Sequence, residues 1–156
     1  MAIVSRGGEL GGDLAVATRS PVLVLAGKTA LRLPLASVCI AWDGGDQAAA
    51  ALRAAVPLLQ GCKEIHVLTV TSGSAFDFPA TDALRYLSRH DIKAELHELP
   101  KVNSVEESLA AAAASLGAQL MVMGAYGHSR MREMLFGGVT RYFLSEASAP
   151  SLLLAH

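Results

Sequence analysis

The hydrophobic pattern from residue 37 onward switches repeatedly between short apolar runs and helical spacing. Continuous apolar runs at residues 38–42, 65–70 and 120–123 are typical of parallel strands that are buried on both faces. Between such runs, apolar side chains recur every three or four residues, and this spacing predicts helices. The first helix carries Ala49, Leu52, Val56 and Leu59 on one face, and Gly61 supplies its end. Pro79 suits the first turn of the second helix.

The second half of the chain continues the alternation. Residues 92–99 alternate in polarity, with Ile92, Ala94 and Leu96 on one side, which predicts a strand at a sheet edge. Ser104 and Glu107 fit the capping-box pattern, and the helix that they open runs to Gly117. A fourth helix at residues 139–147 and a last strand at residues 150–154 complete the series.

Five strands and four helices in strict alternation predict an α/β fold with a doubly wound parallel sheet. In such sheets, ligands bind at the carboxyl ends of the strands, where the winding direction reverses. The first and fourth strands are the neighbours at that point. Asp43, Gly44 and Gly45 follow the first of them, and residues 124–127 follow the other.

Residues 1–36 do not fit this alternation. Glycines 7, 8, 11 and 12 predict a mobile start. Residues 20–25 read as a lone strand whose sequence is similar to that of residues 149–154. We therefore expect an N-terminal extension over residues 1–36, followed by one domain over residues 37–156.

Composition and charge exclude several classes of protein. The chain has 156 residues, of which 52% are apolar and 17% charged, so it is long and apolar enough for one well-packed domain. No apolar run approaches the roughly 20 residues of a membrane span, and the N-terminus lacks the apolar core of a signal peptide. We expect a cytoplasmic protein without a membrane partner. A net charge of −1 without a basic block argues against nucleic acid as a partner.

Nothing in the sequence supports a metal site. The two cysteines, Cys39 and Cys62, lack metal-binding spacing, and Cys39 lies within a predicted strand, where it is expected to be a small buried residue. The five histidines are scattered without an i, i+4 pair.

The candidate chemistry lies in the glycines near the C-terminus. Gly124 and Gly127 directly follow an apolar strand, and after nine residues Gly137 and Gly138 precede a helix that starts at Val139. Glycine lets a backbone approach an anion closely, and the N–H groups of a helix start carry partial positive charge. Either these residues form a phosphate cradle, or they are unrelated turn and cap glycines.

These residues resemble the universal stress protein family. Its nucleotide-binding members carry a glycine, two residues, a glycine, nine residues, and a glycine followed by Ser or Thr. Gly124, Gly127 and Gly137 have that spacing, and Asp43 matches the family's Asp at the end of the first strand. The resemblance covers roughly residues 37–156. It implies the adenine nucleotide alpha-hydrolase-like fold with strand order 3-2-1-4-5, to which residues 20–25 add an extra strand.

The resemblance implies that the chain binds an adenine nucleotide, ATP or AMP, with or without Mg²⁺. Gly124 would lie near the ribose, and the phosphates would be surrounded by Gly127, His128, Gly137, Gly138, Val139 and Thr140. The residue after the third glycine is Gly138, so a hydroxyl that would bond a phosphate oxygen is missing, and Thr140 supplies a hydroxyl two residues later.

Other candidate residues have two interpretations each. Asp43 could accept a hydrogen bond from the adenine amino group or the ribose, or it could cap the following helix. Arg130 could neutralise phosphate charge, or it could be an ordinary solvated loop residue. Trp42 could stack on a base or face the core, and Val70 could line the base pocket or simply be core. The candidate binding set is completed by Ala41 and Met123, at or near the ends of their predicted strands.

The function expected from the resemblance is a stress-response regulatory module that dimerises through its last strand, residues 151–154. Residues 20–25 look like the last strand of a preceding domain, which suggests the C-terminal domain of a tandem protein and a second strand for the dimer contact. No catalytic residue is visible, because His128 has no nucleophile or carboxylate beside it in the sequence. Two alternatives remain: a structural dimerisation module without nucleotide, and an enzyme that at most hydrolyses ATP slowly.

Overall fold

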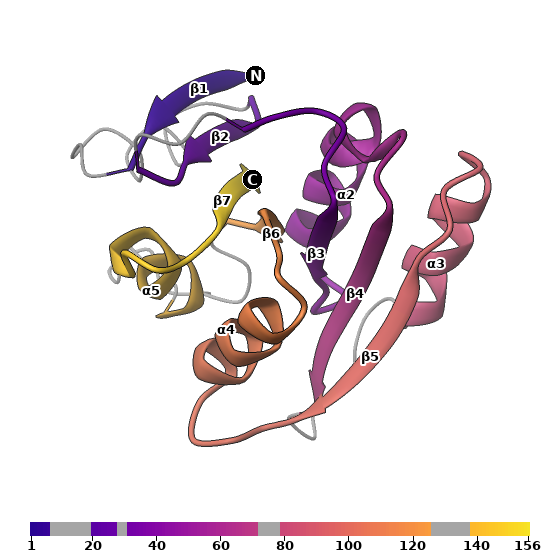
Figure 1. Cartoon of the computed structure of the whole chain (residues 1–156). Coiled ribbons are helices and arrows are strands. Elements are labelled where there is room, and N and C mark those ends of the chain that lie inside the picture. Colours follow the sequence, from indigo (N-terminus) through magenta and orange to yellow (C-terminus); the bar gives the residue numbers. More distant parts are fainter. Residues whose placement is uncertain (7–19, 28–30, 72–78, 126–137) are drawn as a thin grey trace.

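A computed structural model describes residues 1–6, 20–27, 31–71, 79–125 and 138–156 of the chain (Figure 1). Within this part of the chain, seven strands form one sheet in the order β1-β2-β7-β6-β3-β4-β5. The strands are β1 (Ala2–Ser5), β2 (Val22–Leu25), β3 (Ser37–Ala41), β4 (Glu64–Thr71), β5 (Glu95–Pro100), β6 (Leu120–Gly124) and β7 (Ser151–Ala155). The helices are α2 (Asp46–Leu59), α3 (Ala80–Ser88), α4 (Val105–Ser115) and α5 (Gly138–Ser145).

The predicted doubly wound sheet is confirmed. The strands β5, β4, β3, β6 and β7 are neighbours in that order and pair in parallel, which is the predicted order 3-2-1-4-5. The winding reverses between β3 and β6, whose register pairs Val38 with Leu120 and Ile40 with Val122. The carboxyl ends of these two strands therefore lie side by side.

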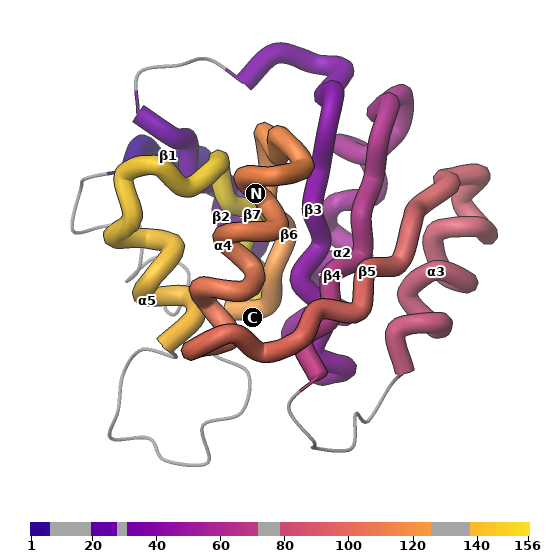
Figure 2. The backbone as a smooth tube through the Cα atoms, turned by 60° about the horizontal axis from the view of Figure 1, so that its bottom comes forward, coloured from indigo at the N-terminus to yellow at the C-terminus, as the bar shows by residue number. Residues whose placement is uncertain are grey.

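Helices cover both faces of the sheet. Figure 2 shows α4 and α5 on one face and α2 and α3 on the other. Consecutive residues of β3 accordingly enter different cores: Val38 and Ile40 pack with α2 and α3, whereas Cys39 belongs to the core beneath α4 and α5. This two-sided burial is why the central strands are continuous apolar runs in the sequence.

The N-terminal extension joins the same sheet. The predicted strand at residues 20–25 is present as β2, and it pairs antiparallel with β7 in the same chain, placing Val22 opposite Leu154. The strand β1 was not predicted; it pairs in parallel with β2.

The Arg6 guanidinium donates hydrogen bonds to the backbone carbonyls of Glu146, Ala149 and Pro150, and this anchors the end of β1. Because β2 and β6 flank β7, both hydrogen-bonding edges of the last strand are occupied within the chain. The predicted mobile start at glycines 7, 8, 11 and 12 lies outside the described residues.

Several element boundaries differ from the prediction by one to three residues, and two of these differences have a clear local reason. The edge strand β5 begins at Glu95 and not at residue 92, because Asp91 has a left-handed backbone (φ 58°). The N–H of Ile92 then donates to the carbonyl of Leu87, at 3.1 Å, and not to a strand. Helix α5 ends at Ser145 and not at residue 147. Beyond that end, the Glu146 carboxylate accepts hydrogen bonds from the N–H and hydroxyl of Ser148 and turns the chain.

Of the two reciprocal hydrogen bonds of the predicted capping box, the structure has one. The Ser104 hydroxyl oxygen accepts a hydrogen bond from the N–H of Glu107, at 3.2 Å, as predicted. The N–H of Ser104 donates to the carbonyl of Val102, at 2.7 Å, so it is already satisfied without the Glu107 side chain. At the other end of α4, Gly117 has a positive φ of 61°, which is the helix end predicted from the sequence.

Candidate functional site

The candidate site lies where β3 and β6 end. The N–H of Trp42 donates to the carbonyl of Leu68, at 2.8 Å, and the N–H of Ala125 donates to the carbonyl of Ala155, at 2.7 Å. The sheet pairing therefore continues one residue beyond each strand and holds the first residues of both loops in place. This fixes Asp43 and Gly124 at the reversal point, where open α/β sheets bind ligands.

Asp43 organises the turn that leads into α2. Its Oδ1 atom accepts a hydrogen bond from the N–H of Gly45, at 2.9 Å, and the residue is exposed. Gly44 has a positive φ of 73°, which suits glycine. The N-cap position is Gly45, without a side-chain cap, so Asp43 shapes the turn before the helix and does not cap it from the N-cap position.

Gly124 is required by the packing of α2. A Cβ atom at this position would lie 2.7 Å from the backbone nitrogen of Ala48 and 2.7 Å from the carbonyl carbon of Gln47. Both atoms belong to the first turn of α2, which therefore crosses the end of β6 in direct backbone contact. This contact explains the glycine without any ligand.

Among the described residues, the start of α5 leaves room for a side chain at Gly138, and a carboxylate lies beside it. Gly138 is exposed, and within the described part of the chain the nearest atom to a Cβ built there is Oε1 of Glu106, at 3.9 Å. A serine would therefore fit at this position. Glu106 lies in the first turn of α4, so its negative charge sits at the α5 start that was predicted to receive phosphate. Val139 is half-buried, and Thr140 is 3% exposed.

The face of the sheet that α4 and α5 cover carries an apolar core. Ala41, Val70 and Met123 belong to this core, and Val70 and Met123 are 7% and 4% exposed. Trp42 is 5% exposed and packs on the opposite face, against the core of α2 and α3. Its side chain is therefore in the core, which is one of the two interpretations that the sequence left open.

Four of the predicted binding residues lie outside the described part of the chain: Gly127, His128, Arg130 and Gly137. The structure places Asp43 and Gly124 at neighbouring strand ends and Glu106 beside the start of α5, and the four loop residues stay predictions from the sequence.

The two cysteines are ordinary core and near-core thiols. Cys39 is fully buried, and burial raises the pKa of its thiol to about 12. Cys62 is half-buried, and its Sγ donates to the carbonyl of Leu58, at 3.2 Å; burial also raises the pKa of this thiol. Neither has the lowered pKa of a reactive cysteine.

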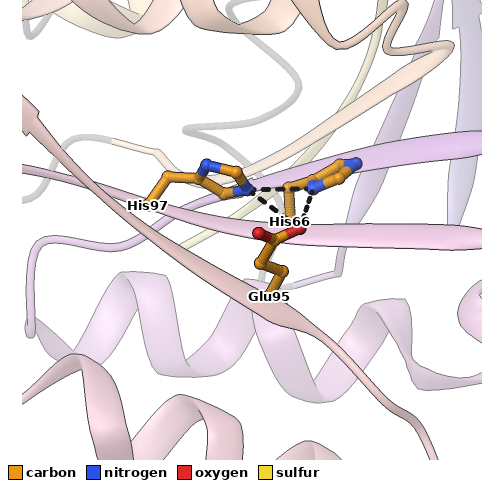
Figure 3. Close-up of side chains that lie close together, drawn as sticks. All are labelled: His66, Glu95 and His97. Carbon is orange, nitrogen blue, oxygen red and sulfur yellow. Dashed lines mark hydrogen bonds and ion pairs between the residues drawn. The ribbon is translucent and has the colours of Figure 1, made fainter.

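A cluster that the sequence did not predict joins His66 of β4 with Glu95 and His97 of β5 (Figure 3). Spacing along the chain could not reveal it, because the residues come from two strands. The available signal was the polar side of the predicted edge strand, which carries Glu95 and His97, beside a histidine in the neighbouring strand.

The comparisons with known proteins agree on the fold. The model of the universal stress protein family matches residues 36–154. No curated protein matches the chain. None of the helices in the described residues is long and apolar enough to span a membrane.

Solved structures of universal stress proteins share this architecture. One from Burkholderia pseudomallei is 22% identical with a TM-score of 0.58, covering 80% of this chain and 98% of that chain. One from Archaeoglobus fulgidus DSM 4304 is 15% identical with a TM-score of 0.76, covering 99% of this chain and 62% of that chain. A third, in complex with cAMP, is 18% identical with a TM-score of 0.56, covering 78% and 97%.

Proposed function

This chain belongs to the universal stress protein family, and from that premise we propose that it is a regulatory module that binds an adenine nucleotide, ATP or AMP, at the carboxyl ends of β3 and β6. The observation that carries the proposal is the position of Asp43 and Gly124 at the reversal point of the sheet. A neighbour with the same fold was solved in complex with cAMP, which supports an adenine nucleotide as the ligand class.

The described residues offer the contacts that such a ligand needs. The exposed Asp43 carboxylate would accept hydrogen bonds from ribose or adenine donors. Ala41, Val70 and Met123 would provide an apolar backing for the base. The backbone N–H groups at the start of α5, from Gly138 to Thr140, would face the phosphates, since a helix start has unpaired N–H groups and partial positive charge.

The part of this site that would hold the phosphates offers fewer favourable contacts than the part that would hold the base and ribose. Gly138 lacks the hydroxyl found in nucleotide-binding relatives, and the Glu106 carboxylate lies beside it. A negative charge near a helix start competes with a phosphate for the same positive field. We therefore propose modest affinity, with little gain from the added phosphates of ATP over AMP; Mg²⁺ would offset part of the repulsion.

The proposal extends to the organisation of the protein. Residues 1–36 form an extension to a domain at residues 37–156, and the chain acts in the cytoplasm as a homodimer. A dimer contact along the β7 backbone requires exchange of β2 between protomers, because β2 already occupies that edge. The structure from Archaeoglobus fulgidus DSM 4304 is longer than this chain and aligns with 99% of it, so the extension lies within the shared fold.

A second candidate is a structural module without nucleotide. It is favoured by the Gly124 contact with α2, which accounts for that glycine by packing alone. In this reading Asp43 serves only the turn before α2.

Equilibrium binding separates these functions. ATP, ADP and AMP are titrated calorimetrically into the purified full chain, with and without Mg²⁺, and reaction products are followed in the same samples. Asp43→Asn keeps an acceptor for the Gly45 N–H but removes the charge; we expect a fivefold to tenfold loss of affinity, the equivalent of about 1–1.4 kcal/mol. Asp46→Asn, an exposed change in the first turn of α2, is the matched control.

Absence of binding at millimolar nucleotide would refute the nucleotide proposal and leave the structural module. Product formation at turnover rates would instead support an enzyme. Equal effects of the Asp43 and Asp46 variants would remove Asp43 from the site.

A further inference from the structure

The cluster of His66, Glu95 and His97 has the dimensions of a metal site. His66 Nδ1 lies 3.1 Å from His97 Nε2 and 3.9 Å from Glu95 Oε2, and His97 Nε2 lies 3.6 Å from the same carboxylate oxygen. Figure 3 shows the three side chains converging on one point from two neighbouring strands. In register, His66 is paired with Glu95, and His97 follows two residues later on the same face of β5.

The three atoms leave room for a metal ion at bonding distance from each. A triangle with these sides has a circumradius of about 2.1 Å, and Zn²⁺ bonds to imidazole nitrogen and carboxylate oxygen are about 2.0–2.2 Å long. At that distance the ion lies in the plane of the three atoms. A small adjustment of the Glu95 side chain, which is 70% exposed, would shorten the two longer sides and let the ion rise out of this plane toward a tetrahedral geometry.

Hydrogen bonding alone leaves this cluster poorly satisfied. At 3.1 Å, one histidine must donate to the other. If His66 Nδ1 is the donor, its buried Nε2 is an acceptor that faces the Glu64 carboxylate, 3.9 Å away, and has no hydrogen-bond partner. If His97 Nε2 is the donor, the Nδ1 lone pair of His66 accepts that hydrogen, and the buried Nε2–H of His66 points to the Glu64 side, 3.9 Å from the carboxylate. Either arrangement leaves the buried Nε2 of His66 without a hydrogen-bond partner among the described residues.

A bound cation would give all three converging ligand atoms a common partner. The lone pairs of His66 Nδ1 and His97 Nε2 and one oxygen of Glu95 would point at the metal. The remaining His66 nitrogen, Nε2, would then carry its hydrogen and face Glu64, an arrangement typical of metal-binding histidines.

We propose that His66, Glu95 and His97 bind a Zn²⁺ ion that joins the edge strand β5 to β4. Two imidazoles and one carboxylate are donors that Zn²⁺ favours, and three protein ligands leave a fourth tetrahedral position for water. The site lies in the amino-terminal half of β4, four residues before Val70. It is thus separate from the proposed nucleotide site, roughly 13 Å farther along the strand.

The experiment uses the metal-free full chain without an affinity tag. ZnCl₂ is titrated calorimetrically, Co²⁺ is added as a spectroscopic probe, and thermal unfolding is followed with and without Zn²⁺. We expect one Zn²⁺ per chain, the strong visible absorption of tetrahedral Co²⁺, and a rise in Tm of roughly 5–10 °C at a free Zn²⁺ concentration about 100 times the Kd.

Variants of the two accessible ligands test the assignment. His97→Gln and Glu95→Gln should each weaken Zn²⁺ binding at least about tenfold, which is the lower bound seen even for outer-shell partners. The matched controls are His90→Gln, an exposed histidine beyond α3, and Glu98→Gln, on the other face of β5; both should bind Zn²⁺ like the wild type. His66 is buried and is left intact, so that loss of folding is not mistaken for loss of a ligand.

Three results would overturn the proposal: binding of Zn²⁺ that is unchanged in His97→Gln, an octahedral Co²⁺ spectrum, or no Tm shift in the wild type. The outcome does not depend on the proposed function, since Asp43→Asn should leave Zn²⁺ binding intact.

Discussion

Replacing Gly124 by alanine tests whether this glycine serves the fold or a ligand. The added Cβ would lie 2.7 Å from Ala48 N and Gln47 C and 2.8 Å from Gln47 Cβ. Optimal contacts between such atoms are about 3.5–4.0 Å, so the start of α2 or the end of β6 must move by roughly 1 Å. Two of the opposing atoms are helix backbone, which cannot rotate away as a side chain can.

Such overpacking costs about 1–3 kcal/mol. For a chain of this length, 1 kcal/mol corresponds to about 2–4 °C in Tm, so Gly124→Ala should lower Tm by roughly 2–12 °C. The assay is thermal and urea unfolding of the nucleotide-free protein, followed by circular dichroism. Gly138→Ala is the matched control, because its Cβ would meet no atom of the described residues closer than 3.9 Å.

The control should unfold within about 0.5 kcal/mol of the wild type or be slightly more stable, since alanine is favoured over glycine in helices. If Gly124→Ala kept the wild-type Tm and lost only nucleotide affinity, the packing explanation would be wrong. Ligand approach would then be the reason for the glycine.

Four further predictions address the site, the extension and the cysteines. Gly138→Ser should bind ATP about twofold to tenfold more tightly than Gly138→Ala, by one added hydrogen bond, in calorimetric titrations; equal affinities would exclude the missing hydroxyl as the weakness of the site. Glu106→Gln should raise affinity for ATP about twofold to fivefold and for AMP less, because it removes a carboxylate from the helix start; a uniform effect would contradict this electrostatic reason. Deleting residues 1–27 uncovers the β7 edge, so light scattering should still report a dimer, now formed by direct pairing of two β7 strands; a monomer would count against strand pairing at β7. In native protein a thiol reagent should modify Cys62 well before Cys39, with both reacting in denaturant; early modification of Cys39 would contradict its burial and its raised pKa.

The sequence predicted where the central strands lie, because two-sided burial leaves a simple record in apolar runs such as residues 120–123. Their order, 3-2-1-4-5, was implied by the resemblance to the universal stress protein family. The sequence also predicted β2 from its apolar run and proline. It did not predict β1, whose four residues alternate between half-buried and exposed positions and are stabilised by β2 and by the distant contacts of Arg6. The stability of such a strand depends on contacts with residues that are distant in sequence, and its own hydrophobic pattern does not reveal these contacts.

The site was predictable to the level of strand ends and no further. Asp43 and Gly124 could be placed at the reversal point, because winding order decides which strands are neighbours there. The contact between Gly124 and α2, and the approach of Glu106 to Gly138, arise from how separate elements pack in three dimensions. The same holds for His66 and His97, which are 31 residues apart in the chain and meet only through the β4–β5 register.

The N-terminal extension changes which strands of the sheet can accept a partner. Without β1 and β2, the edges would be β7 and β5; with them, β7 is an interior strand whose five residues are all buried, and the edges are β1 and β5. On β5, the exposed side chains of Glu95 and Glu98 oppose edge-to-edge association, as charged edge residues commonly do. On β1, Ile3 is 60% exposed and Met1 59%. Association of the full chain by strand addition is therefore favoured at β1, whereas contact through β7 requires β2 to leave. Because these two routes bury different residues, the extension determines the geometry of any dimer that this chain forms.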